Sequence, residues 1–204
     1  MKKIRTKVRV ALRLLALVVI ASLPTSAYEQ PLTSESIREA FFLGQRRDEV
    51  TARFLASYRH DFPLPKKGPH ISRAQVLTPY AQIVLGSEDG AIQGTVMDAE
   101  REYQTQPSVF LVQVRVFSTP TYYSTSQLKE FWQKLSIRVM QGKLLKPSKI
   151  NYISRRFPGN RGPGGTDIEL QFDVAQIASA PITIEVSSPD GQRIETKFDL
   201  GQLK

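Results

Sequence analysis

Apolar residues at every second position constrain the fold of the chain after residue 108. Phe110, Val112, Val114 and Val116 alternate with polar or intermediate side chains, which is the period of a strand with one buried face. Alternation recurs in 168–174 and in 182–198, where Pro189-Asp190-Gly191 is typical of a hairpin turn. Five or six such strands over roughly a hundred residues predict an antiparallel β-sandwich of immunoglobulin-like architecture.

Residues 131–166 carry weaker patterns. Apolar residues in 131–139 favour a strand, although Leu128–Trp132 also fits a helical turn. Gln141-Gly142 predicts a hairpin turn into a strand over Lys143–Ile153. The Gly- and Pro-rich stretch 156–166 predicts an irregular loop, since Gly165 occupies the lysine position of a phosphate-binding loop and no helix follows.

Residues 28–105 show mainly helical signals. Apolar residues three and four apart, with a capping box at Ser36 and Glu39, predict one helix over 36–59. Gly44 marks a break or a close packing contact within it.

The rest of this part alternates between strand and helix signals. Ile71–Leu77 predicts a short strand, and Thr78-Pro79 opens a helix that ends at Gly86, although 80–85 also fits a strand. Thr95 and Asp98 open a further short helix. We therefore expect an α+β chain, with a mainly helical N-terminal part (28–105) followed by a β-sandwich domain (108–204).

The first 27 residues have the order of a secretory signal peptide. Six basic residues within 1–13 precede the apolar stretch Leu14–Leu23, and Thr25-Ser26-Ala27 supplies a small-residue cleavage site. An uncleaved anchor is the alternative, but ten helical residues span only about 15 Å of a bilayer core of about 30 Å. The pattern predicts export to the periplasm or the exterior of a bacterial cell, and a mature chain that does not span the membrane.

Composition excludes several kinds of chemistry. The chain has no cysteine, so thiolate nucleophiles, Cys-ligated metals and disulfides are absent. The net charge of +9 includes the six basic residues of the signal. Removing 1–27 leaves a nearly balanced chain of net charge +3.

One segment of the mature chain is strongly basic. Residues 131–166, which we name the basic strip, contain eight Lys or Arg and no acid, whereas 167–204 has a net charge of −4. Aromatic residues are interleaved in it, as in surfaces that bind polyanions. Its expected contacts are Lys143, Lys146, Lys149, Arg155, Arg156 and Arg161. The alternative is internal pairing with the acidic neighbour, because adjacent strands favour opposite charges.

The leading hypothesis is an exported, non-catalytic binding or structural module of the cell envelope. Its partner is an envelope protein or an anionic glycan or lipid, and export argues against nucleic acid. The sequence contains no nucleophile elbow, zinc-binding helix or dinucleotide fingerprint, so we expect no catalytic residue, metal or cofactor. The alternative is an exported hydrolase assembled in space from His60, Asp61 or a carboxylate pair.

Overall fold

Two antiparallel sheets form the β part of the chain. The computed structural model describes residues 30–63, 69–105, 108–118, 130–156 and 163–204. The larger sheet has the strand order β1-β2-β3-β7-β6 and the smaller one β5-β4-β8-β9. The strands of the larger sheet are β1 (Arg59–Asp61), β2 (Pro69–Leu77), β3 (Val109–Ser118), β7 (Pro163–Asp173) and β6 (Lys149–Arg156). Those of the smaller sheet are β5 (Lys143–Leu145), β4 (Ser136–Gln141), β8 (Pro181–Ser187) and β9 (Arg193–Asp199).

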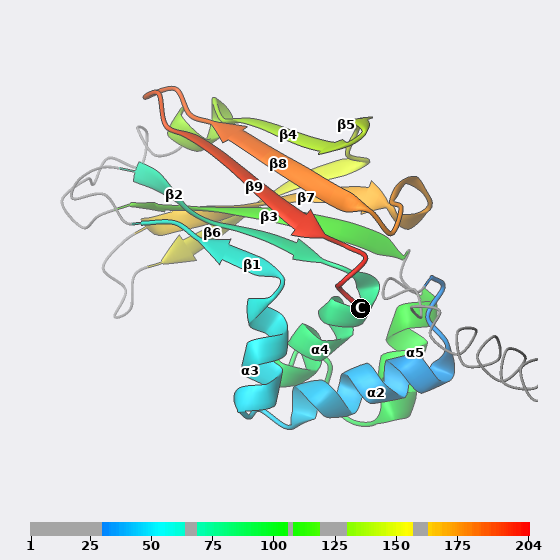
Figure 1. Ribbon diagram of the computed structural model, residues 1–204. Coiled ribbons are helices and arrows are strands. Elements are labelled where there is room, and N and C mark those ends of the chain that lie inside the picture. Colours follow the sequence, from blue (N-terminus) through cyan, green and yellow to red (C-terminus); the bar gives the residue numbers. More distant parts are fainter. Residues whose placement is uncertain (1–29, 64–68, 106–107, 119–129, 157–162) are drawn as a thin grey trace, which may run out of the picture.

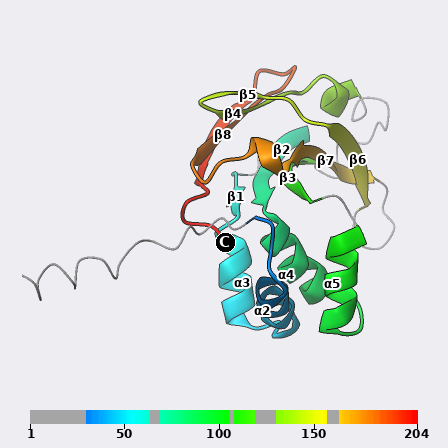
Figure 2. The ribbon, with the colours of Figure 1, turned by 90° about the vertical axis from the view of Figure 1, so that its right-hand side faces the viewer.

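The two sheets form two layers that share one hydrophobic core (Figures 1 and 2). The apolar residues at alternate positions of β3 are fully buried, as their spacing predicts, and three of them pair with Phe172, Leu170 and Ile168 of β7. From the smaller sheet, Ile182, Ile184 and Val186 of β8 join this core. The α+β class and the hairpin of β8 and β9 are therefore confirmed.

Four helices lie on the side of the larger sheet that faces away from the smaller one (Figure 1). They are α2 (Ser34–Gln45), α3 (Glu49–Ala56), α4 (Pro79–Asp89) and α5 (Val96–Thr105). A second hydrophobic cluster holds them together. Gly44 lets α2 approach α4, because a Cβ atom there would lie 2.3 Å from the Val84 carbonyl oxygen. The close contact expected at Gly44 is confirmed.

The single helix expected over 36–59 is wrong. Arg47 adopts a positive φ of 49° and interrupts it. The Asp48 side chain then accepts hydrogen bonds from the amides of Val50 and Thr51, so a second helix, α3, begins there.

The helix opened by Thr78 is confirmed, but its expected end is wrong. The Thr78 hydroxyl accepts a hydrogen bond from the Ala81 amide, and the alternative of a strand over 80–85 is excluded. The helix continues through Gly86 and ends at Gly90, which has the left-handed backbone of a C-cap.

The continuous strand expected over Lys143–Ile153 is also wrong. Residues 146–148 connect β5 in the smaller sheet to β6 in the larger one. Pro147, in this connection, interrupts the expected strand. The loop expected over 156–166 is wrong at both ends, because Arg156 belongs to β6 and residues 163–166 belong to β7. Residues 157–162, like the predicted signal peptide 1–27, lie outside the described residues.

The expected boundary between 105 and 108 falls between α5 and β3. Strands on both sides of it belong to the same sheet, since β2 pairs with β3 along its whole length. Within the described residues, no helix has the length and apolar character needed to cross a bilayer.

Candidate functional site

Three lysines of the basic strip lie at the crossover from β5 to β6. Lys143 begins β5, Lys146 follows its end and Lys149 begins β6. All three are exposed, and none forms an ion pair with a described residue. This crossover is therefore a local concentration of positive charge that the described part of the chain leaves unneutralised.

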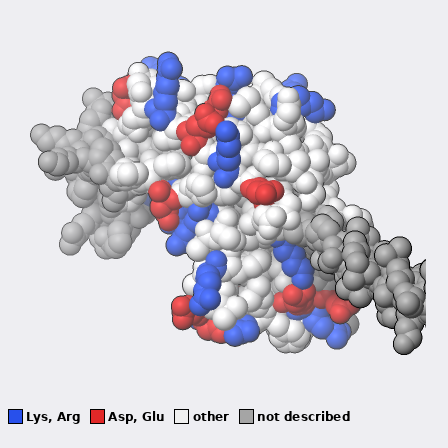
Figure 3. All heavy atoms as spheres, in the orientation of Figure 1, with Lys and Arg blue, Asp and Glu red and all other residues white. Residues whose placement is uncertain are grey.

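Other basic residues of the strip pair inside the molecule. Arg138 contacts Glu185 on the neighbouring strand at 3.2 Å, and Lys134 contacts Glu130 at 3.5 Å. Basic and acidic atoms are interspersed over the face seen in Figure 3. The Arg138 pair is of the kind that the alternative predicted, because Glu185 belongs to the acidic segment 167–204, whereas Lys134 pairs with a residue that precedes the strip.

Arg155 also pairs internally, with a buried carboxylate. Asp167 has no exposed surface, and its two oxygens accept hydrogen bonds from Arg115 at 2.7 and 3.1 Å and from Arg155 at 2.7 Å. The hydrogen bond to Asp167 raises the pKa of Arg115 above its usual value. The sequence places Asp167 on the solvated face of its strand, but the two arginines bury it. The side chain of Arg156 and all of Arg161 lie outside the described residues.

Strand β6 forms one edge of the larger sheet, and in the described part of the chain it pairs with β7 alone. Several large apolar side chains beside the lysines are exposed: Leu144 by 60%, Ile150 by 48% and Tyr152 by 52%. Ile150 and Tyr152 lie on the strand face that also carries buried Leu170 and Ile168 of β7. An edge with apolar, incompletely covered side chains is a surface on which another chain can pair.

A groove runs along the same edge. It has a volume of about 350 Å³ and lies between β6–β7 and the beginning of β4. Trp132 and Ile137 line one side of this groove, and Ile150 and Tyr152 line the other. The basic strip, the open edge and the apolar groove therefore adjoin one another.

The two histidines do not form a catalytic pair. His60 packs against Phe198 with 4.7 Å between ring centroids, and its Nδ1 lies 2.5 Å from the Thr196 hydroxyl. His70 is 2% exposed and packs against Phe117 in the neighbouring strand. Neither histidine lines the groove or the pocket described next.

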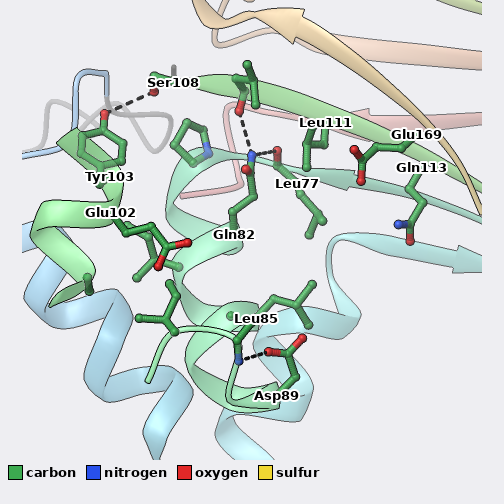
Figure 4. Close-up of a pocket in the computed structure, with 17 residues that line it drawn as sticks. Leu77, Gln82, Leu85, Asp89, Glu102, Tyr103, Ser108, Leu111, Gln113 and Glu169 are labelled. Carbon is green, nitrogen blue, oxygen red and sulfur yellow. Dashed lines mark hydrogen bonds between the residues drawn. The ribbon is translucent and has the colours of Figure 1, made fainter. Parts of the chain in front are cut away.

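A second cavity of about 310 Å³ lies between α4, α5 and the exposed face of β3 and β7. Leu77, Leu85 and Leu111 form apolar walls, and the carboxylates of Asp89, Glu102 and Glu169 lie around it (Figure 4). The sequence did not predict this pocket because its residues come from five separate elements, β2, α4, α5, β3 and β7. The one signal available was Glu169, a charged residue that the β7 alternation places opposite the sandwich core.

Comparisons with family models, curated proteins and solved structures gave no significant match. Among the described residues, no group of three or more His, Cys, Asp or Glu side chains has the arrangement of a metal site. The function must therefore be argued from the surfaces and cavities themselves.

Proposed function

We propose that the protein is an exported, non-catalytic binding module of the cell envelope that engages an anionic partner through the basic strip. The immunoglobulin-like arrangement of its facing sheets is part of this proposal. The observation that carries it is the set of exposed lysines Lys143, Lys146 and Lys149, which have no ion pair in the described chain. Arg156 and Arg161 belong to the proposed contact on the charge of the sequence alone, whereas Arg155 already pairs with Asp167.

The surroundings of the lysines favour an acidic protein segment as the partner. An edge strand offers main-chain hydrogen bonds that an added strand can use, and neighbouring pockets receive its alternate side chains. The groove beside Ile150 and Tyr152 would take apolar side chains, while Lys146 and Lys149 would face acidic ones. An anionic glycan or lipid surface would use the charges but not the edge hydrogen bonds.

A panel of fluorescent ligands tests this choice. We expect an extended peptide of alternating valine and glutamate to bind the purified protein, with affinity falling as salt rises, because exposed charges are screened over about 10 Å at 0.1 M salt. The same peptide with lysine in place of glutamate should not bind. Equal binding of both peptides would contradict an anionic partner. If heparin or anionic vesicles bind and the valine–glutamate peptide does not, a protein partner is contradicted.

A hydrolase is the second candidate, and one observation favours it. Glu102 and Glu169 line the same pocket, and glycoside hydrolysis needs two carboxylates flanking the substrate. Release of chromophore from a panel of nitrophenyl glycosides, abolished by Glu169→Gln, would support this activity. No turnover by the purified protein across the panel would count against it.

A further inference from the structure

The pocket between α4, α5 and the larger sheet combines an apolar interior with acidic side chains at its margin. Leu77, Ile83 and Ile92 are buried residues of the interior, whereas Asp89 and Glu102 are exposed. No Lys, Arg or His is among the described residues that line it. We propose that this pocket binds a small amphipathic cation, an amine that carries a hydrocarbon or aromatic group.

The size of the cavity suits such a ligand. Its volume of about 310 Å³ lies at the lower end of the range for small-molecule sites, which are mostly apolar with a few placed polar groups. The hydrocarbon part would occupy the space between Leu77, Leu85 and Leu111, three side chains that border the open centre in Figure 4. Burial of apolar surface supplies most of the affinity of a ligand of this kind.

The polar groups of the pocket select a cation. Glu169 accepts hydrogen bonds at Oε1 from the side-chain amides of Asn151 at 3.1 Å and Gln171 at 3.2 Å. These contacts hold the carboxylate in place and use donors that carry no charge. Glu169 lies directly opposite Gln113 of β3, and both side chains border the pocket in Figure 4.

The second acidic position comes from α5. The Glu102 side chain extends toward the open centre of the pocket (Figure 4). Nearby, the Tyr103 hydroxyl accepts hydrogen bonds from the Leu32 amide and the Ser108 hydroxyl, which link α5 to the segment before α2 and to the residue before β3. An ammonium group at this margin would keep part of its hydration while its charge is matched by carboxylates. The margin therefore orients the ligand and excludes anions, since like charges oppose binding.

Three ligands of similar shape and different charge test the proposal by isothermal titration calorimetry of the purified protein. Phenethylammonium should bind roughly tenfold tighter than phenethyl alcohol at low salt, since a few exposed charge contacts together supply a factor of that size. Phenylacetate should bind more weakly than either. The preference for the amine should shrink as salt is raised.

Two variants locate the site. Glu169→Gln and Glu102→Gln each remove one charge at nearly constant size, and each should reduce the preference for the amine severalfold while leaving affinity for the alcohol unchanged. Glu100→Gln on the same helix α5 is the matched control, because Glu100 does not line the pocket. Equal affinity for all three ligands, no binding of the amine, or an equal effect of Glu100→Gln would overturn the proposal. Neither variant changes a lysine of the basic strip, so the peptide-binding assay tests the proposed function separately.

Discussion

Single residues hold the larger sheet together where its charged face meets solvent. Asp167 is the clearest case, because its buried carboxylate accepts hydrogen bonds from arginines on both neighbouring strands, β3 and β6. A second ion pair, between Arg73 and Asp61, joins β2 to the edge strand β1 at 2.5 Å. Ion pairs between charged side chains thus connect strands on one face of this sheet, while the other face packs in the hydrophobic core.

Removal of the Asp167 charge should destabilise the protein. We expect Asp167→Asn to lower the free energy of unfolding by about 2 kcal/mol, because it leaves two arginines without their shared acceptor. Urea unfolding followed by circular dichroism measures this. Glu195→Gln removes an exposed ion pair with Lys197 and should cost under about 0.5 kcal/mol. Equal costs for the two variants would contradict the structural role of Asp167.

Tyr58 predicts how stability depends on alkaline pH. Burial raises the pKa of the Tyr58 hydroxyl to about 12, and this hydroxyl donates to the Lys204 carbonyl oxygen at 2.6 Å. The folded pKa exceeds the ordinary value of 10.0, so the neutral form contributes stability that is complete below pH 10 and is lost as pH rises through about 12.

The measurement is the free energy of unfolding between pH 9 and 12, compared across two variants. Tyr58→Phe should flatten part of this decline and cost about 1–2 kcal/mol near neutral pH through its lost hydrogen bonds. Tyr152→Phe, at an exposed position, should leave the profile unchanged. Identical pH profiles for Tyr58→Phe and the unaltered protein would contradict the burial of this hydroxyl.

At the scale of elements, strand β7 shows where local sequence misleads. Composition marks 156–166 as a loop, yet residues 163–166 pair with β3 and β6. Gly165 is required there by tertiary contact, because a Cβ atom would lie 2.1 Å from the Val116 carbonyl oxygen. Glycine signals a turn in isolation, and only the neighbouring strand shows that it serves a close approach.

Substitution of Gly165 tests this interpretation. Gly165→Ala should lower the free energy of unfolding by about 2–3 kcal/mol, since β3 and β7 would have to separate locally. Gly142→Ala, in the turn between β4 and β5, is the control because no atom lies within 4 Å of its Cβ position. That change should cost only about 1 kcal/mol, because the positive φ of Gly142 is unfavourable for a residue with a Cβ atom. A Gly165→Ala protein as stable as the control would show that this contact is not tight.

Elements whose apolar residues recur at a clear period, or whose ends carry clear capping or turn residues, could be predicted from the sequence. The alternating apolar residues predict β3, Thr78 and Pro79 predict the start of α4, and the turn residues Pro189-Asp190-Gly191 predict the β8–β9 hairpin. The break at Arg47 and the crossover at Pro147 could not, because both depend on how neighbouring elements pack. The lysines of the strip could be predicted as candidates because their charge is visible in the sequence. The groove and the pocket could not, because both also depend on how the elements pack.

At the scale of the whole molecule, the three layers create the two surfaces for which we propose ligands. The crossover from β5 to the edge strand β6 carries three lysines that pair with no described residue and adjoins the apolar groove, and the pocket lies between the larger sheet and the helices. The nearly balanced charge of residues 28–204 therefore conceals a local asymmetry. Three of the six basic side chains that the structure describes in the strip form ion pairs, and the other three, Lys143, Lys146 and Lys149, pair with no described residue.

A charge-reversal variant tests the central proposal most directly. The triple variant Lys143→Glu, Lys146→Glu and Lys149→Glu should bind the valine–glutamate peptide at least roughly tenfold more weakly at low salt. A control of equal charge change, Arg38→Glu, Arg193→Glu and Lys197→Glu, should retain the affinity because these residues lie on α2 and β9. Equal loss in both variants, or unchanged affinity of the first, would contradict the basic strip as the binding surface.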